Sequence, residues 1–387
     1  FSTLLVSYRR DRPSLEAAWK FIMITTTGII FALLGTLFLA IAVQDVQNLS
    51  GQDPMAWSFL GRTETATNLH LEPNFVMLSF IFILIGYGTK AGLAPMHTWL
   101  PDGHGQAPSP VSALLSGVML KSALYAILRY YTITNISLGN DQFTSWLLRI
   151  TGLVSLIIVT PFILKRNRFK RLLAYHSVEH MGIITFGIGL GTHLAIFAAL
   201  LHALNHALTK SLMFLMYGSI QYEYANQLPV DAAEGDLDDH ITGVLKALPI
   251  SGTILGLGGL ALVGTPPFNI FMSEFMILWA GIKSQINLPK TDSAMVLAGT
   301  KPIMIVFLGL FLMTVTIIFG GMVSHLARIL LGRAPFPTVE PSKTKMLWLW
   351  PSIGLLFIIA VFGLLIPVWP VNFPDLLERS VEILYWK

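Results

Sequence analysis

The chain has 387 residues, 54% of them hydrophobic and only 12% charged, with a formal net charge of +4 and no cysteine. About a quarter of the residues in an ordinary soluble domain are charged, so this composition excludes a typical soluble globular protein. Without cysteine the chain holds no disulfide, thiolate metal site or iron–sulfur cluster, and its basic residues flank apolar segments, which indicates membrane topology and not nucleic-acid binding.

Long apolar runs recur along the chain, and a bilayer crossing needs about 20 such residues. Residues 1–8 resemble the last turns of a crossing that starts upstream, so we expect an N-terminally truncated piece of a longer protein. The polar insert 219–244 is predicted to be a surface loop. The predicted crossings are 18–43, 73–92, 109–131, 145–165, 173–191, 193–218, 245–283, 302–331 and 347–368.

Glycine and proline interrupt two of these crossings. Gly92 and Pro95 stand where the second predicted helix should continue, and Pro266 and Pro267 stand inside the segment 245–283. Non-helical backbone at membrane depth is tolerated where it lines a polar cavity or is buried in protein. A pair of such broken helices is typical of transporters built from inverted repeats.

The positions of Lys and Arg predict the orientation of the chain. Residues 165–171 (KRNRFKR) contain five basic residues in seven, so this loop is predicted to be cytoplasmic. Arg328 and Arg333 reach the same side only if 245–283 crosses once, as a discontinuous helix, and not twice. We therefore predict an all-α polytopic membrane protein with about nine crossings plus the tail of a tenth.

Ionisable side chains inside the predicted crossings are the clearest functional signal. A charge at the bilayer centre costs about 2.5–3.5 kcal/mol, so it needs a partner or a hydrated path. Lys90 could snorkel to the interface or form a packing ion pair, whereas Lys121 is too central to snorkel. The candidates for a proton pathway are Lys90, Lys121, His202, His206, Lys210 and Glu274, with Glu179 and His180 as secondary candidates.

Three of these candidates share one helix face. His202, His206 and Lys210 follow a spacing of i, i+4 and i+8 in an otherwise apolar segment. They are either hydrogen-bonded core residues or a proton relay, because neutral imidazole both donates and accepts. Glu179 and His180 fit a capping or interfacial pair equally well. Several buried charges on separate predicted helices favour a proton or ion path.

A further polar group, His97, Asp102 and His104, lies in the stretch PMHTWLPDGHGQAP. Its spacing matches no strong pattern of metal ligands. The proline and glycine content predicts a rigid turn instead. We predict no metal site.

Four sequence blocks resemble a known family. The block 90–129 (KAGLAPMHTWLPDGHGQAPSPVSALLSGVMLKSALYAILR) closely resembles the signature of the antiporter-like subunits of respiratory complex I, Mrp-type antiporters and membrane-bound nickel–iron hydrogenases of group 4. Residues 171–182 (RLLAYHSVEHMG), 202–214 (HALNHALTKSLMF) and 264–279 (GTPPFNIFMSEFMILW) match further blocks in the same order. The SVEHMG motif and residues 14–20 (SLEAAWK) are most similar to component F of hydrogenase-4 and formate-hydrogenlyase-type complexes.

The resemblance implies a fold of fourteen helices in two inverted repeats. The chain would form one antiporter-like domain over 1–387 that lacks the first helices of that fold. Residues 9–131 would be the remainder of the first repeat and 145–331 the second. Residues 332–387 would form a C-terminal helix and tail.

The same resemblance implies roles for single residues. Lys90 matches a lysine on the first broken helix, whose partner glutamate would precede this chain. Lys121 matches the central connecting lysine, His206 a histidine before the second broken helix, and Lys210 a lysine found in some members. Glu274 matches the terminal residue that gates exchange to the outside.

The function implied is proton translocation by a membrane subunit of a redox-driven complex, such as a hydrogenase, a formate hydrogenlyase or an NADH dehydrogenase-like enzyme. The expected partners are other membrane subunits, a peripheral redox arm and the lipid of a bacterial or archaeal cytoplasmic (inner) membrane, and no nucleic acid. This chain is expected to bind no cofactor and to catalyse nothing alone.

Two alternatives stay open. The first is a subunit of a Na⁺/H⁺ antiporter of the Mrp type, which works without a redox partner. The second is an intramembrane enzyme, for example an acyltransferase that uses one buried histidine. A pump predicts a polar row that crosses between helices, whereas the enzyme predicts a catalytic histidine in a cavity open to lipid.

Overall fold

The computed structural model is helical throughout the residues that it describes, as the sequence predicted. The described residues are 2–44, 71–165, 168–228, 237–286, 294–339, 351–356, 358–359, 379–382 and 384. Their helices are α1 (Ser2–Val6), α2 (Arg12–Gln44), α5 (Pro73–Ala91), the 3-10 turn η1 (Met96–Thr98), α6 (Trp99–Gln106), α7 (Ser109–Leu114), the π-turn η2 (Leu115–Met119), α8 (Leu120–Leu138), α9 (Gln142–Leu164), α10 (Phe169–Gly189), α11 (His193–Gln227), α13 (Leu237–His240), α14 (Val244–Ala247), α15 (Pro249–Leu262), α16 (Asn269–Ile286) and α17 (Ala294–Leu331).

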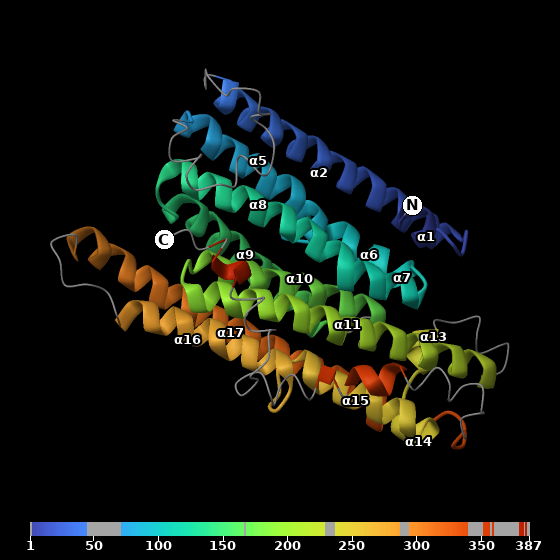
Figure 1. The fold of residues 1–387 in the computed structure, drawn as a ribbon. Coiled ribbons are helices and arrows are strands. Elements are labelled where there is room, and N and C mark those ends of the chain that lie inside the picture. Colours follow the sequence, from blue (N-terminus) through green and yellow to red (C-terminus); the bar gives the residue numbers. More distant parts are fainter. Residues whose placement is uncertain are drawn as a thin grey trace.

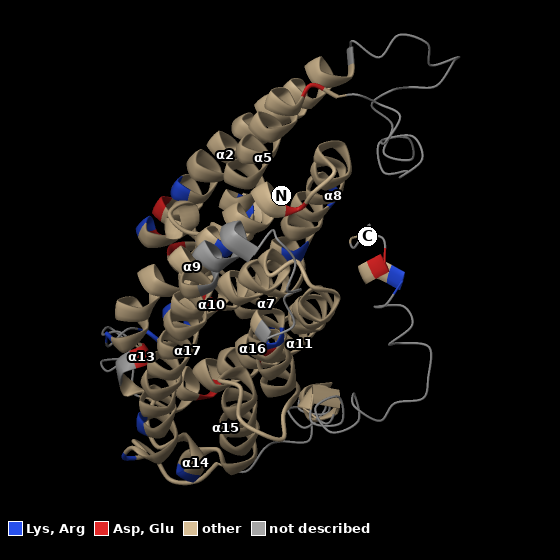
Figure 2. Ribbon diagram, turned by 90° about the vertical axis from the view of Figure 1, so that its left-hand side faces the viewer, with Lys and Arg blue, Asp and Glu red and all other residues tan. Residues whose placement is uncertain are grey.

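The long helices lie side by side along one common direction (Figure 1). Most of each ribbon carries neither acidic nor basic residues (Figure 2), as expected for helices in a bilayer. Five described stretches are long and apolar enough to cross a membrane: Arg12–Val43, Pro73–Gln106, Ser109–Leu138, Gln142–Leu164 and Pro302–Leu331. The chain is therefore a multi-pass membrane protein.

Two long helices are absent from that apolar group, and they lie inside the bundle. Helices α10 and α11 have 21 and 35 residues, enough to cross a bilayer, but polar side chains interrupt their apolar sequence. Nearly every residue of α10 is buried. Helix α10 packs against α9 and α11, and α11 packs against α15 and α16. The apolar helices thus shield two polar ones.

The first predicted break is present between α5 and α6. Helix α5 ends at Ala91, and Gly92 follows in the left-handed conformation with φ of 78°. The carbonyl of Thr89, in the last turn of α5, accepts a 3.3 Å hydrogen bond from the N–H of Gly92 and a 2.8 Å hydrogen bond from the indole Nε1 of Trp99. The break occurs inside the protein, where such groups find partners.

The second break separates α15 from α16. Helix α15 ends at Leu262 and α16 begins at Asn269, with Pro266 and Pro267 between them. Figure 1 shows α15 and α16 following each other in one direction beside α11. That the segment 245–283 crosses the bilayer once, as a discontinuous helix, stays a prediction.

One predicted loop is wrong in part. The insert 219–244 was expected to be a surface loop, but α11 continues through it to Gln227. Tyr224 is buried and donates a 2.7 Å hydrogen bond to the carbonyl of Thr242, so tertiary contacts stabilise the added turns. The predicted crossing 347–368 lies for the most part outside the described residues.

Candidate functional site

The centre of the site is a contact between Lys121 and His206. The Lys121 ammonium lies 2.5 Å from Nδ1 of His206 and donates a 2.7 Å hydrogen bond to the carbonyl of Ser116. Ser116 belongs to the π-turn η2, which directly precedes α8, the helix whose second residue is Lys121. A π-turn carries one residue more per turn than an α-helix and is frequent at functional sites. Here the carbonyl of Ser116, within the π-turn, accepts the hydrogen bond from the Lys121 ammonium.

Three histidines continue from this contact into the bundle. The rings of His206 and His180 lie 4.7 Å apart between centroids. Nδ1 of His180 is 2.9 Å from Nε2 of His202, whose Nδ1 is 2.9 Å from the hydroxyl of Ser273. Helices α8, α10, α11 and α16 therefore each contribute a residue to one polar row. His202, His206 and His180 are all buried.

The row reaches Glu274 at the second broken helix. One carboxylate oxygen of Glu274 and one nitrogen each of His180 and His202 lie within 4.8 Å of one another. A Cβ at Gly264 would come within 2.5 Å of Oε2 of Glu274, so the carboxylate lies against the backbone of the break. The break thus places an acidic group beside the histidines.

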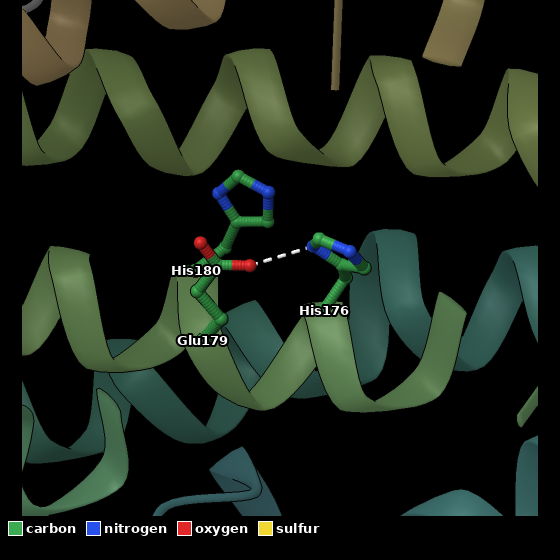
Figure 3. A group of neighbouring side chains, drawn as sticks. All are labelled: His176, Glu179 and His180. Carbon is green, nitrogen blue, oxygen red and sulfur yellow. Dashed lines mark ion pairs between the residues drawn. The ribbon is translucent and has the colours of Figure 1, made fainter. Parts of the chain in front are cut away.

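A second acidic group lies on α10 beside the same row (Figure 3). Oε2 of Glu179 is 2.6 Å from Nδ1 of His176, one turn earlier on the helix, and both side chains are buried. His176 was absent from the predicted site. Its signal in the sequence was the spacing His176–His180, which places two histidines on one face of α10 as i and i+4.

Lys210 is a further basic residue beside the row. It is completely buried, and its ammonium donates a hydrogen bond to the carbonyl of Leu173 on α10. The ammonium also lies 5.9 Å from the ring centroid of Phe214. Lys210 thus lies against α10, the helix that also carries Glu179.

Two groups of side chains could hold a metal ion by proximity. They are His176 with Glu179 and His180, and His180 with His202 and Glu274. Two nitrogens of the second group are already in contact with each other, at 2.9 Å. Hydrogen-bonded imidazoles can pass protons along their contacts, because each ring has one donor and one acceptor nitrogen when neutral.

Lys90 is the predicted residue that the structure does not bring to the row. It is half-buried near the end of α5 and makes no hydrogen bond or ion pair with the described part of the chain. Lys121, His180, His202, His206 and Glu274 do come together.

Residues 1–297 match the protein family described as NADH:quinone oxidoreductase/Mrp antiporter, TM. The hydrogenase-4 component F homolog of Methylacidiphilum infernorum (isolate V4) is 42% identical over 277 residues, which are 72% of this chain and 55% of that protein. Hydrogenase-4 component B of Escherichia coli (strain K12) is 30% identical over 319 residues, 79% of this chain and 43% of that protein. The chain spans about half the length of these curated relatives.

Two solved structures share the fold. A chain of the membrane-bound sulfane sulfur reductase, an archaeal respiratory membrane complex, has a TM-score of 0.78 at 22% identity, over 99% of this chain and 69% of that one. A chain of the Mrp complex from Dietzia sp. DQ12-45-1b has a TM-score of 0.69 at 19% identity, over 97% and 69% of the two chains. At these identities the likeness concerns the fold alone.

Proposed function

Because the chain belongs to the NADH:quinone oxidoreductase/Mrp antiporter transmembrane family, we propose that it translocates protons as a membrane subunit of a redox-driven complex. The similarity to hydrogenase-4 component F favours a hydrogenase-type complex. Its partners would be other membrane subunits and a peripheral redox arm, in a bacterial or archaeal cytoplasmic membrane. The chain would hold no cofactor, and its electrons would flow in the partners.

The observation that carries this proposal is the polar row that runs from the half-buried Lys121 through the buried His206, His180 and His202 to the half-buried Glu274. Buried ionisable groups in a membrane are costly and mark ion pathways. Lys121 lies 2.5 Å from His206 and His180 lies 2.9 Å from His202, distances that suit proton transfer, and between these two pairs the rings of His206 and His180 lie 4.7 Å apart between centroids. Glu179 and Lys210 would supply charges that shift the proton along the row.

The first prediction concerns Lys121, the central member of the row. Lys121→Ala in the assembled complex should lower proton translocation about tenfold or more, because the contact to His206 is lost. Electron transfer by the peripheral subunits should persist in part. Proton uptake into inside-out membrane vesicles and electron transfer are measured on the same preparation, with Ser122→Ala, the exposed neighbour on α8, as the matched control.

The proposal is wrong if Lys121→Ala assembles normally and still translocates protons at the unmodified rate. The family also includes Mrp antiporters, so sodium/proton antiport is the second candidate function. Sodium-dependent proton exchange in vesicles that lack any redox partner would favour it. Activity only with the redox partner present would favour the redox-driven complex.

A further inference from the structure

An apolar groove lies between α15 and α17, away from the polar row. Its volume is about 330 Å³, and it extends from Leu245 on α14 to Leu260 in the last turn of α15. Leu257, Leu260 and Ala327 line the groove and are exposed, so it opens toward the outside of the bundle. We call it the α15–α17 groove. Its walls are formed mainly by Gly256, Leu257 and Leu260 of α15 and by Val323, Leu326 and Leu330 of α17.

The lining of the groove favours a hydrocarbon chain over water. A buried water needs two to four polar partners. Thr253 has the one hydroxyl among the lining side chains, and this hydroxyl already donates a 2.8 Å hydrogen bond to the carbonyl of Pro249. An alkyl chain needs no polar partner and gains dispersion contacts along such a wall.

Two basic side chains lie at one end of the α15–α17 groove. Lys246 directly follows the lining residue Leu245, and Arg333 comes three residues after the lining residue Leu330. Both side chains are exposed, and neither forms an ion pair or hydrogen bond with a described residue. Figure 2 shows basic residues at this α14 end of the bundle. The N-terminus of α15 lies at the same end without a side-chain cap, and it adds a partial positive charge.

Hydrogen bonds keep the backbones of these two residues close together. The hydroxyl of Thr242, just before α14, donates a 2.7 Å hydrogen bond to the carbonyl of Arg333. The hydroxyl of Thr338 donates a 2.9 Å hydrogen bond to the carbonyl of Lys246. The two basic side chains therefore start from neighbouring segments, and one anionic group at the end of the groove can face both.

The same end of the groove belongs to the predicted cytoplasmic side. His325, near the end of α17, donates a 3.0 Å hydrogen bond from Nε2 to the carbonyl of Ile163 in the last turn of α9. Helix α9 leads directly into the basic run 165–171, which predicts the cytoplasmic side. The cytoplasmic leaflet is the one that carries anionic lipids, and basic pockets between transmembrane helices on that side bind their headgroups.

We propose that the α15–α17 groove binds one acyl chain of an anionic phospholipid, whose phosphate lies between Lys246 and Arg333. The charges favour this occupant. An apolar transmembrane helix in the groove would leave both basic groups without a counter-ion, and a zwitterionic lipid would bring its own competing cation. The proposal does not depend on the proposed function, because the groove lies outside the polar row.

The test uses the assembled complex in nanodiscs that contain a phosphatidylglycerol analogue with a diazirine in its acyl chain. Irradiation and peptide mass spectrometry should place the label on residues 245–260 and 323–330. A phosphatidylcholine analogue with the same chain should label these residues about tenfold less, because each basic residue near the membrane surface adds about fivefold to the binding of an anionic lipid.

The charge variant is Lys246→Gln combined with Arg333→Gln. Both side chains are exposed, so the fold should be unchanged, and the two analogues should then label the groove equally. The matched control is Lys283→Gln, which removes an exposed lysine in the last turn of α16. Helix α16 continues in the direction of α15, so Lys283 lies far from the basic end of the groove and the preference should persist (Figure 1).

A second variant tests the groove itself. Ala327→Phe places a larger side chain in the groove and should lower labelling by both analogues. If this variant fails to assemble, Thr253→Phe, at the other exposed wall, is measured in its place. Unchanged labelling in the variant that assembles would show that the lipid lies elsewhere and would overturn the proposal.

The remaining outcomes also decide the matter. Equal labelling by the two analogues in the unmodified complex overturns the anionic lipid as the occupant. A groove that neither analogue labels is covered by protein, either a partner subunit or another segment of this chain, and this result overturns the proposal as well. A preference that survives the double substitution overturns the role of Lys246 and Arg333. Proton translocation enters none of these measurements, so failure of the proposed function would be seen separately.

Discussion

At the scale of single residues, the second helix break depends on one glycine. Gly264 has φ of 70°, a conformation that costs other residues about 1–2 kcal/mol, and a Cβ there would meet the Glu274 carboxylate. Gly264→Ala should therefore lower the free energy of unfolding by about 1–2 kcal/mol. It should also reduce proton translocation, because Glu274 must move away from the row. Thermal denaturation and vesicle proton uptake would measure both effects.

The control for this substitution is Gly309→Ala on α17. A Cβ at Gly309 meets no atom within 4 Å, and its φ lies outside the left-handed region. The added methyl group should leave stability and translocation unchanged. Equal behaviour of the two variants would contradict the role assigned to Gly264.

At the scale of elements, two glycines set the distance between α9 and the polar helix α10. A Cβ at Gly152 would lie 2.6 Å from the carbonyl oxygen of Gly182, and a Cβ at Gly182 would lie 2.9 Å from that of Gly152. Small residues allow such close approach of membrane helices. This contact holds α10, and with it His176 and His180, against α9.

Gly152→Leu should force α9 away from α10, because no flexible side chain can yield at the contact. We expect a loss of about 1–3 kcal/mol in stability, visible as a lower midpoint of thermal unfolding. Gly320→Leu on α17 serves as the control, since a Cβ there contacts nothing within 4 Å. A stable Gly152→Leu variant with unchanged translocation would refute this packing argument.

At the scale of the whole molecule, the predicted orientation can be tested directly. The chain has no cysteine, so a single introduced cysteine is a unique label. Asn140 and Arg168 are both exposed and lie beyond opposite ends of α9. Arg168→Cys should react with an impermeant maleimide only in inside-out vesicles, and Asn140→Cys only in intact cells. Labelling of both from the same side would contradict the assigned topology.

The sequence by itself determined that this is a helical membrane protein with two interrupted helices. Both are local properties of the chain, because a bilayer forces each span to satisfy its own backbone hydrogen bonds. The breaks after Ala91 and Leu262 therefore follow from the glycine and proline residues that are written there. The inverted repeats over 9–131 and 145–331 stay a prediction.

Only the tertiary structure decided which polar side chains of the long helices meet. Lys121 contacts His206, 85 residues away in the sequence. Lys90 lies in a span as apolar as that of Lys121, but it forms no hydrogen bond or ion pair with a described residue. The extension of α11 to Gln227 and the burial of His104 were likewise decided by packing. The rotation of a helix about its axis depends on its neighbours, and apolar runs alone do not specify it.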